Sequence, residues 1–305
     1  MTRLLWIARP QFVLSGLALF IFGISLAILM GAPFSLVRTL LGYLILLPAH
    51  LSISYSNDYF DVDVDKYDKP TFFSGGSGVL VDHPELRKPA LWTAVILTMC
   101  SLAFGIVFQI VYSFPFWLLG GVLLGNLLGW FYSAPPLRLA YRGLGELAMI
   151  ISVGLLIPGS GFVVTSGQMN LDGLPFSAPM MLYGLAFIIA VEIPDMESDR
   201  LGHKMTWVAR RGRRFGFTLI AASFLLATLC LFCFPWLATR SYPLDFRFLG
   251  MLSLLPLGTG CIGFLKKPME KQSATRAVNA IMITVAVFCV LADAYLISLV
   301  IIQMR

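Results

Sequence analysis

Charged side chains and cysteines are scarce in this sequence. Lys, Arg, Asp and Glu make up 12% of the 305 residues, about half of the fraction that is usual in a soluble domain. All five cysteines fall within long apolar stretches, and the C-x-x-C formed by Cys230 and Cys233 has no second pair or histidine nearby. A soluble globular domain is therefore excluded, and the cysteines do not indicate a zinc or redox site.

Long hydrophobic runs take the place of those charges. Hydrophobic residues make up 58% of the chain and fall into nine blocks of about 20 residues, enough for a helix to cross a bilayer. No polar linker divides the chain, so residues 1–305 are predicted to form one all-α domain, a polytopic membrane bundle of about nine transmembrane helices. The blocks are 11–31, 36–57, 89–111, 115–133, 146–165, 178–194, 215–235, 247–265 and 277–302.

The positions of Lys and Arg predict how the bundle is oriented. With the N-terminus in the cytoplasm, four of the 22 Lys and Arg residues lie on the opposite side and the other 18 lie on the cytoplasmic side. We therefore expect a multi-pass protein of the cell (inner) membrane, with cytoplasmic loops at 58–88 and 195–214. The net charge of +6 then reflects topology and anionic lipid headgroups, and it requires no nucleic-acid partner.

Carboxylates gather at the ends of the second and sixth apolar blocks. We name Asn57-Asp58-Tyr59-Phe60-Asp61-Val62-Asp63-Val64-Asp65 the first acidic motif and Asp195-Met196-Glu197-Ser198-Asp199 the second. Carboxylates are costly beside lipid, so their concentration indicates a bound divalent cation. On a helix, Asn57 or Asp58 shares one face with Asp61 and Asp65, and Asp195 shares one with Asp199. Such oxygen ligands suit Mg²⁺, which also binds substrate phosphates, so the motifs predict a site for a Mg²⁺-bridged diphosphate.

Two other interpretations of the acidic motifs are weaker. Solvated loop charges are the simpler one, but a carboxylate at the C-terminal end of a helix meets the negative end of the helix dipole. A calcium loop is the other, because Asp61, Asp63 and Asp65 match its first ligands. Lys66 stands where that loop requires glycine and Phe72 where it requires glutamate, so the calcium interpretation fails.

Cations, one further acid and a glycine-rich stretch accompany the motifs. Arg138 and Lys204 are candidates to bind phosphate oxygens. Glu192 lies one turn before Asp195 and is either a ligand or acceptor contact or a water-solvated carboxylate. The loop 71–78, which contains Ser74-Gly75-Gly76-Ser77-Gly78, is either a lid over the substrate or a flexible turn.

These residues resemble a known family. The N-D-x-x-D-x-x-x-D at 57–65, the D-x-x-x-D at 195–199 and the nine spans together resemble the UbiA superfamily of intramembrane prenyltransferases. The segment 132–139, Tyr-Ser-Ala-Pro-Pro-Leu-Arg-Leu, is similar to the Tyr-Ser-x-Pro-Pro loop of that family. The following segment 141–146, Tyr-Arg-Gly-Leu-Gly-Glu, is similar to the corresponding segment in the branch of the family that prenylates dihydroxynaphthoate for menaquinone. Ala140 and the Glu197-Ser198 pair depart from patterns seen elsewhere in the family.

The resemblance implies a fold and a set of site residues. The helices would surround a central cavity that opens to the cytoplasmic side. Two Mg²⁺ ions would be held, one by Asn57, Asp58, Asp61 and Asp65 and the other by Asp195 and Asp199. Lys204 would contact the diphosphate, and Asn57, Tyr132, Arg138 and Glu192 would complete the substrate contacts. The residues expected to carry the chemistry are Asp61, Asp195, Asp199 and Lys204.

The reaction implied by the resemblance is transfer of an isoprenyl chain from a polyprenyl diphosphate to an aromatic quinone precursor through an allylic carbocation. The acceptor is expected to be dihydroxynaphthoate-like, and membrane lipids are expected around the enzyme. Transfer to a non-aromatic lipid alcohol is the alternative within the family. A secondary transporter with acidic ion-coupling residues is the alternative from another class, but transporter sites lie near the bilayer midplane rather than at helix ends.

Overall fold

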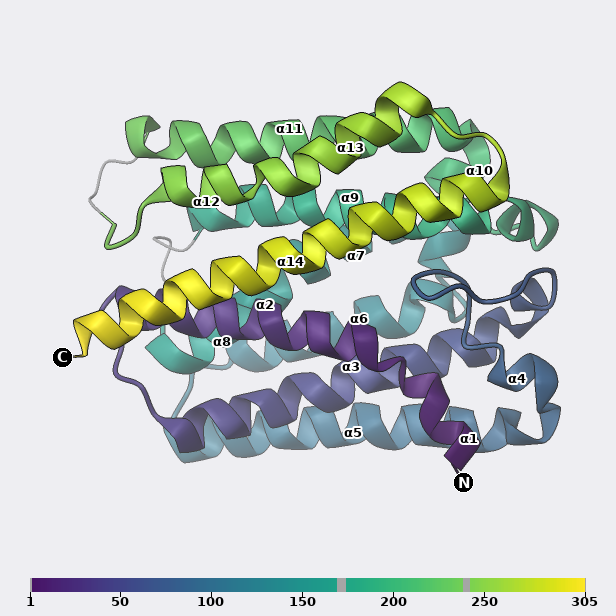
Figure 1. Cartoon of the computed structure of the whole chain (residues 1–305). Coiled ribbons are helices and arrows are strands. Elements are labelled where there is room, and N and C mark those ends of the chain that lie inside the picture. Colours follow the sequence, from purple (N-terminus) through teal and green to yellow (C-terminus); the bar gives the residue numbers. More distant parts are fainter. Residues whose placement is uncertain (1, 169–173, 238–241, 305) are drawn as a thin grey trace.

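The computed structural model describes residues 2–168, 174–237 and 242–304. Most of these residues are helical, and none of them forms a strand (Figure 1). All nine predicted blocks are helical. Eight helical segments in the described part of the chain are long and apolar enough to cross a membrane. They are α2 (Pro10–Leu29), α3 (Leu36–Asp65), η2 with α5 (Pro84–Tyr112), α7 to α8 (Gly145–Ser166), α9 (Leu174–Leu201), α11 (Arg213–Leu237), α12 to α13 (Phe246–Lys266) and α14 (Lys271–Gln303).

The ninth block, 115–133, forms the shorter helix α6 (Trp117–Ser133). Its 17 residues give a length of about 26 Å, at the lower limit for crossing the hydrocarbon core of a bilayer. The prediction of a polytopic all-α bundle is confirmed, with eight helical segments of full membrane length among the residues described and one short apolar helix.

Two predicted boundaries were wrong in the same way. The second block was expected to end at 57, but α3 continues to Asp65, and the sixth was expected to end at 194, but α9 continues to Leu201. Both acidic motifs are therefore the last turns of long helices, as their helical spacing predicted, and the loops expected at 58–88 and 195–214 begin later than 58 and 195. Hydropathy marks where apolar side chains stop, whereas a helix ends where its backbone hydrogen bonds stop.

Two other predicted helices are interrupted. The block 146–165 contains a π-helical turn (η4, Ser152–Leu156) between α7 (Gly145–Ile151) and α8 (Ile157–Ser166). Pro158 follows directly, and its missing N–H removes a helical hydrogen bond at this point. The block 247–265 divides at Ser253 into α12 (Phe246–Leu252) and α13 (Leu254–Lys266).

The helices pack in pairs: the consecutive long helices α3 and α5 lie along one edge of the bundle (Figure 1), and α2 pairs with α8, which is far from it in the sequence. The largest buried core lies between α9, α11 and α14. The α2–α8 pair approaches closely through glycine: a Cβ on Gly23 would lie 1.9 Å from the carbonyl oxygen of Pro158. Such contacts between backbones need small residues, as is usual for helices packed in lipid.

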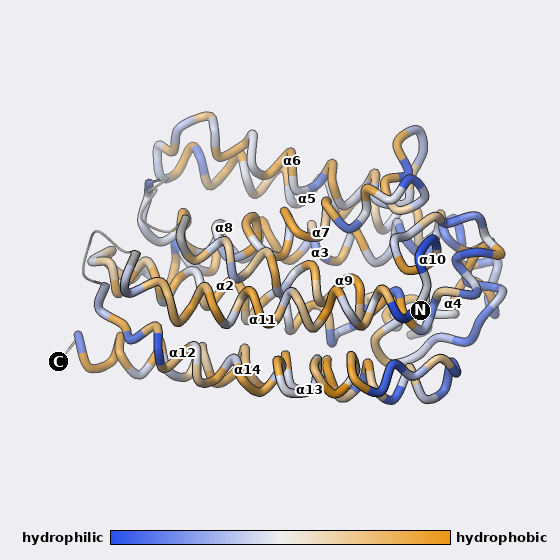
Figure 2. The backbone as a smooth tube through the Cα atoms, turned by 90° about the horizontal axis from the view of Figure 1, so that it is seen from above, coloured by the Kyte–Doolittle hydropathy of each residue, from blue (hydrophilic) through white to orange (hydrophobic). Residues whose placement is uncertain are grey.

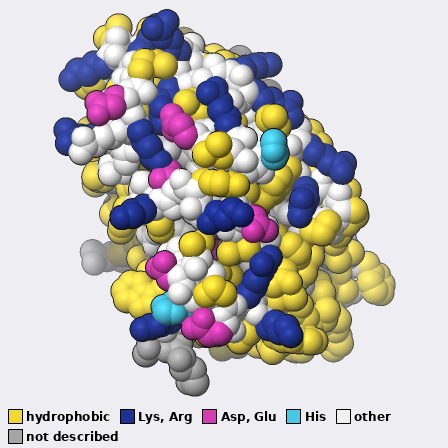
Figure 3. Space-filling view, turned by 90° about the vertical axis from the view of Figure 1, so that its right-hand side faces the viewer, with side chains coloured by type: hydrophobic (Ala, Val, Ile, Leu, Met, Phe, Trp, Pro, Cys, Tyr) yellow, Lys and Arg dark blue, Asp and Glu magenta, His cyan; other side chains and the backbone are white. Residues whose placement is uncertain are grey.

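Hydrophilic residues collect at one end of the bundle, around α4 (Val79–Asp82) and α10 (Trp207–Arg211) (Figure 2). Viewed from this end, Lys, Arg, Asp and Glu side chains lie among polar surface, with hydrophobic side chains along one flank (Figure 3). On α5, Trp92, Ile96 and Ile110 are exposed, as expected for side chains that face lipid. The protein is thus an integral multi-pass membrane protein, and both acidic motifs belong to its polar end.

Candidate active site

The structure brings the two acidic motifs together at the polar end. Lys204, three residues after α9, donates a hydrogen bond from Nζ to Oδ2 of Asp61 on α3 at 2.9 Å. The helix ends also touch directly, because a Cβ on Gly202 would lie 2.6 Å from Cγ2 of Val64. Residues separated by more than 100 positions therefore form one acidic cluster with a buried cation inside it.

Asp61 is the centre of this cluster. Its carboxylate accepts hydrogen bonds from Ser133 Oγ at 2.8 Å, from Tyr141 Oη at 2.9 Å and from Lys204. Ser133 ends α6, and Tyr141 belongs to the short helix η3 (Leu139–Arg142). Only 7% of the Asp61 side chain is exposed, so this charge is satisfied almost entirely by protein donors.

The electrostatics of the cluster favour a charged Lys204 and a neutral Tyr141. Burial lowers the pKa of Lys204, but the Asp61 and Asp199 carboxylates more than offset this, so its pKa lies well above the ordinary value. Burial and the neighbouring Asp61 carboxylate both raise the pKa of Tyr141. Lys204 is thus a fixed cation, and Tyr141 is a fixed donor of one proton to a hydrogen bond.

The loop 71–78 lies between the two motifs and contacts both. Gly75 N–H donates to Asp195 Oδ2 at 2.7 Å, and Ser77 donates to Asp58 through its N–H at 3.2 Å and through its Oγ. Gly75 has φ +76°, a conformation that favours glycine. A Cβ on Gly76 would lie 2.0 Å from Asp65 Oδ2, so a side chain there would collide with the first motif. This geometry fits the predicted lid, which stays a prediction.

The donor set fits Mg²⁺ in part. Asp and Asn oxygens are the ligands this ion prefers, and Asn57 Oδ1 is buried without a hydrogen-bond partner. Asp199, also buried, accepts a hydrogen bond from Thr206 Oγ1 at 3.0 Å. Within the described ranges, no three of the Asp, Glu, His and Cys residues form a group that could hold a metal by themselves. The site therefore suits an ion that takes one or two protein carboxylates and its other ligands from water and phosphate.

Three further residues were predicted as substrate contacts. Arg138 is exposed, and its guanidinium carbon lies 5.1 Å from the centre of the Tyr141 ring. Tyr132 packs against the main core and lies within electrostatic range of Lys204. Glu192 is only 4% exposed, so its interpretation as a water-solvated carboxylate was wrong; it accepts a hydrogen bond from the backbone N–H of Val208 at 3.2 Å.

Sequence reasoning missed several residues that complete the site. Arg9 precedes α2 with φ 49°, and Asp58, Asp195 and Asp65 all interact with it electrostatically. Burial lowers the pKa of Arg9, and these three acids oppose that shift. The Arg9-Pro10 pair that opens the first span was a signal for it. Ser133 and Tyr141 flank the Pro-Pro loop, but nothing in their spacing indicates a bond to Asp61.

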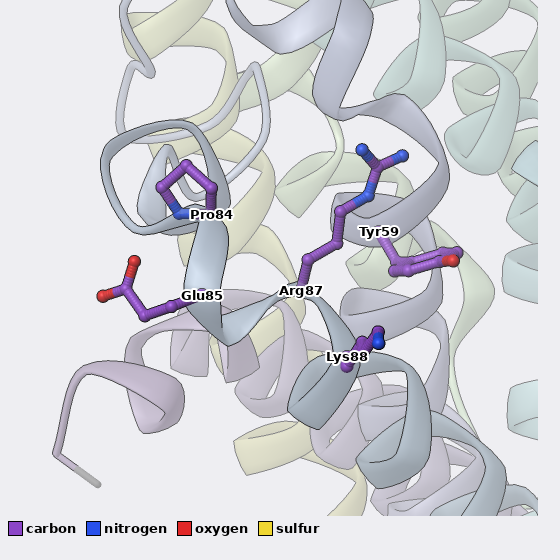
Figure 4. Close-up of a pocket in the computed structure, with 5 residues that line it drawn as sticks. All are labelled: Tyr59, Pro84, Glu85, Arg87 and Lys88. Carbon is purple, nitrogen blue, oxygen red and sulfur yellow. The ribbon is translucent and has the colours of Figure 1, made fainter.

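A cavity lies beside the start of α5 (Figure 4). Its volume is about 460 Å³, and Tyr59, Pro84, Glu85, Arg87 and Lys88 line it. The guanidinium carbon of Arg87 lies 5.1 Å from the centre of the Tyr59 ring, while Glu85 points away from that ring. Of the first acidic motif only Tyr59 lines this cavity, and none of the predicted site residues does.

The fold and the site thus define a helical membrane protein in which two acidic helix ends are joined through Lys204. Residues 17–287 match the UbiA prenyltransferase family, and the chain belongs to that family. Over 172 residues it is 29% identical to a 1,4-dihydroxy-2-naphthoate octaprenyltransferase of Bacillus subtilis, covering 56% of this chain and 54% of the relative. Over 191 residues it is 27% identical to a probable chloroplastic homogentisate phytyltransferase 2 of Oryza sativa, covering 59% and 47%. The chain thus spans about half the length of the curated relatives it matches.

Solved structures share the fold over nearly the whole chain. A UbiA homolog from Archaeoglobus fulgidus bound to GPP and Mg²⁺ has a TM-score of 0.67 at 14% identity, covering 98% of this chain and 99% of that one. The apo structure of a UbiA homolog from Aeropyrum pernix K1 has a TM-score of 0.66 at 15% identity, covering 95% and 98%. A digeranylgeranylglyceryl phosphate synthase has a TM-score of 0.64 at 15% identity, covering 98% and 100%.

Proposed function

We propose that this protein is a Mg²⁺-dependent prenyltransferase that moves an isoprenyl chain from a polyprenyl diphosphate to an aromatic quinone precursor within the membrane. The single observation that carries the proposal is the bond between Lys204 and Asp61, because it unites both acidic motifs and a buried cation in one site. We extend the proposal to residues 1–305 as one domain, with the site and the N-terminus on the cytoplasmic side of the cell membrane.

The roles of the acidic residues follow from this geometry. Asn57, Asp58, Asp61 and Asp65 would hold one Mg²⁺, and Asp195 and Asp199 the other. Bound there, the ions would neutralise the diphosphate as it leaves. Ser133 and Tyr141 fix the direction of the Asp61 carboxylate through their hydrogen bonds. A structural neighbour supports a site for both groups, since the Archaeoglobus fulgidus homolog was solved with GPP and Mg²⁺.

Two cations would bind the diphosphate itself. Lys204 lies between Asp61 and Asp199, and Arg9 lies near Asp58 and Asp195, so both can reach an anion placed between the motifs. We assign Arg138 to the rim of the site, through its contact with Tyr141. Tyr132 remains a proposed cavity-lining residue. We assign Glu192 no direct substrate contact, because it is buried and its carboxyl accepts the backbone N–H of Val208.

The chemistry needs a dry site. The allylic C–O bond breaks with its electron pair leaving on the diphosphate, and the resulting carbocation would react with water if water were present. The loop 71–78 covers both motifs through Gly75 and Ser77 and would exclude water at this step. The acceptor carbon then forms the new C–C bond, and loss of a proton or of a carboxyl group as CO₂ restores aromaticity.

Two relatives support an aromatic acceptor. Their names specify 1,4-dihydroxy-2-naphthoate and homogentisate, which are both aromatic acids. We therefore propose a dihydroxynaphthoate-like acceptor, with a quinone such as menaquinone as the end product of the pathway. A non-aromatic lipid alcohol is the competing acceptor. An ion-coupled transporter is disfavoured, because the carboxylates lie at helix ends rather than on a broken helix at the midplane.

The test is a mass-spectrometric assay on the purified full-length chain in lipid nanodiscs. Geranylgeranyl diphosphate would be supplied with 1,4-dihydroxy-2-naphthoate, homogentisate or a glycerol-phosphate lipid alcohol, with Mg²⁺ or with a chelator. We expect a prenylated naphthoate product that requires Mg²⁺. Absence of product with every acceptor, or equal turnover after chelation, would contradict the proposal, and product from the lipid alcohol alone would replace the acceptor assignment.

A further inference from the structure

A pair of buried glutamates beside the site has no part in the reaction proposed above. Glu146 lies in the first turn of α7 and is fully buried, and Glu192 lies on α9 with 4% of its surface exposed. The two carboxyls interact with one another, and each keeps one buried oxygen, Glu146 Oε2 or Glu192 Oε1, without a hydrogen-bond partner. Ionised carboxylates have only acceptors, so a hydrogen bond between these two oxygens requires one of the two carboxyls to carry a proton.

The other oxygens of the pair accept the first backbone N–H groups of α10. Glu146 Oε1 accepts the N–H of Trp207 at 2.5 Å, and Glu192 Oε2 accepts that of Val208 at 3.2 Å. Thr206 Oγ1 accepts the next, from Ala209, at 3.2 Å. Glu146 Oε2 and Glu192 Oε1 are both buried without a hydrogen-bond partner, so a proton shared between them would satisfy both oxygens.

The position of α10 determines where Lys204 lies. Only Met205 and Thr206 separate Lys204 from the first residue of this helix. On its other side, the backbone N–H of Lys204 donates to the carbonyl of Asp199 at 2.7 Å, and Thr206 Oγ1 donates to the Asp199 carboxylate. The segment that carries Lys204 is therefore fixed at one end by α9 and at the other by the two glutamates.

We propose that Glu146 and Glu192 form a positioning pair that shares one proton, binds the start of α10 and thereby keeps Lys204 against Asp61. One negative charge spread over the pair suits the N–H groups of Trp207 and Val208, which start α10 and have no partner within that helix. The effect on Lys204 as a diphosphate ligand rests on the proposed function. The shared proton and the contact with α10 do not.

Glutamine substitutions give an asymmetric test of the shared proton. In Glu146→Gln or Glu192→Gln, the amide NH₂ replaces the shared proton as donor and the amide oxygen still accepts its backbone N–H. In the double variant both amide oxygens are needed by α10, so the two NH₂ groups face each other without an acceptor. We expect each single variant to keep the thermal unfolding midpoint of the wild type and a donor KM within about twofold of the wild-type value. The double variant should raise that KM about tenfold, with a smaller change in kcat.

A matched cycle and a spectroscopic measurement complete the test. Glu197 also lies on α9, but its carboxylate bonds to Arg213 through two contacts of 2.6 Å, so Glu146→Gln combined with Glu197→Gln should give additive effects. The infrared C=O band of a protonated carboxyl should weaken in each of the single variants Glu146→Gln and Glu192→Gln relative to the wild type. Additive effects in Glu146→Gln/Glu192→Gln, or an unchanged band in both single variants, would overturn the pair.

The measurements also separate this inference from the proposed function. Infrared spectra and unfolding midpoints need no substrate. If the wild-type chain shows no transferase activity, while the band weakens and the double variant loses stability beyond the sum of the single variants, the positioning pair stands and only the proposed function falls.

Discussion

The two acidic motifs obtain their hydrogen bonds by different routes. On α3, Asp61 accepts bonds from Ser133 and Tyr141, which lie 72 and 80 positions away in the chain. On α9, Asp199 accepts a bond from Thr206, only seven positions away. Asp61 is therefore completed by tertiary packing, and Asp199 by the turn that follows its own helix, although Asp195 in the same motif also accepts the distant N–H of Gly75. Substitutions at distant partners should disturb the first motif most, and substitutions in 202–206 the second.

The largest expected effect is at Asp61, where the tertiary contacts converge. Asp61→Asn removes a charge that pairs with Lys204 and replaces an acceptor oxygen by a donor, so we expect turnover to fall by at least about 100-fold. The matched control is Asp63→Asn in the same motif, because the Asp63 side chain is 76% exposed. Steady-state assays should show near wild-type turnover for the control. Equal losses in the two variants would remove the special role of Asp61.

The next effect concerns the loop that joins the motifs. Gly76→Ala places a Cβ 2.0 Å from Asp65 Oδ2, so the loop must move away from the first motif. We expect turnover to fall about 10-fold or more, with the unfolding midpoint little changed because the loop lies at the end of the bundle. Gly121→Ala is the control, since nothing lies within 4 Å of its added Cβ. A fully active Gly76→Ala variant would show that the loop need not stay where it lies.

A smaller loss is expected from a single donor to Asp61. Tyr141→Phe removes one of its three hydrogen bonds and leaves the ring in place beside Arg138. One such bond to a charged group contributes about 1.5–3 kcal/mol, so kcat/KM should fall roughly 10- to 100-fold when measured with saturating Mg²⁺. Tyr43→Phe is the control, because the Tyr43 ring packs against Phe20 rather than against the acidic motifs. It tests whether loss of a tyrosine hydroxyl matters in general. A Tyr141→Phe variant with unchanged kcat/KM would argue that the first motif does not depend on this tertiary contact.

The smallest effect is expected at the local contact of the second motif. Thr206→Ala removes both the cap of α10 and the bond to Asp199, at a cost of about 1 kcal/mol in the free energy of unfolding. Thr206→Ser keeps the hydroxyl and should restore stability and turnover. Thermal unfolding in detergent would measure the difference. If serine fails to restore what alanine removes, the hydroxyl is not the group that matters.

The fold could be predicted well because lipid imposes a simple rule on sequence. Nine continuous apolar blocks gave the correct helices, including the short α6. The two motifs were also found, since carboxylates stand out in an apolar chain. The helix ends at Asp65 and Leu201 were missed because hydropathy does not report backbone hydrogen bonding.

The partners of the motifs could not be predicted, for a physical reason. Ser133, Tyr141 and Glu146 lie in segments that carry the family resemblance, but they act through contacts that exist only when separate helices pack, so the sequence does not indicate their partners. Lys204 was found through its nearness to the second motif, but its bond to Asp61 spans 143 positions. Arg138 shows the converse: a residue that looked suited to the site lies exposed at its edge.

The contact between Asp61 and Lys204 also has a consequence for how the protein is made. Synthesis proceeds from the N-terminus, so Asp61 is synthesised 143 residues before its partner Lys204. During that interval the acidic end of α3 has to stay in water, because an unpaired carboxylate is not stable in lipid. The site is thus assembled only once α9 has been inserted, and a nascent chain that stops earlier is translated but inert.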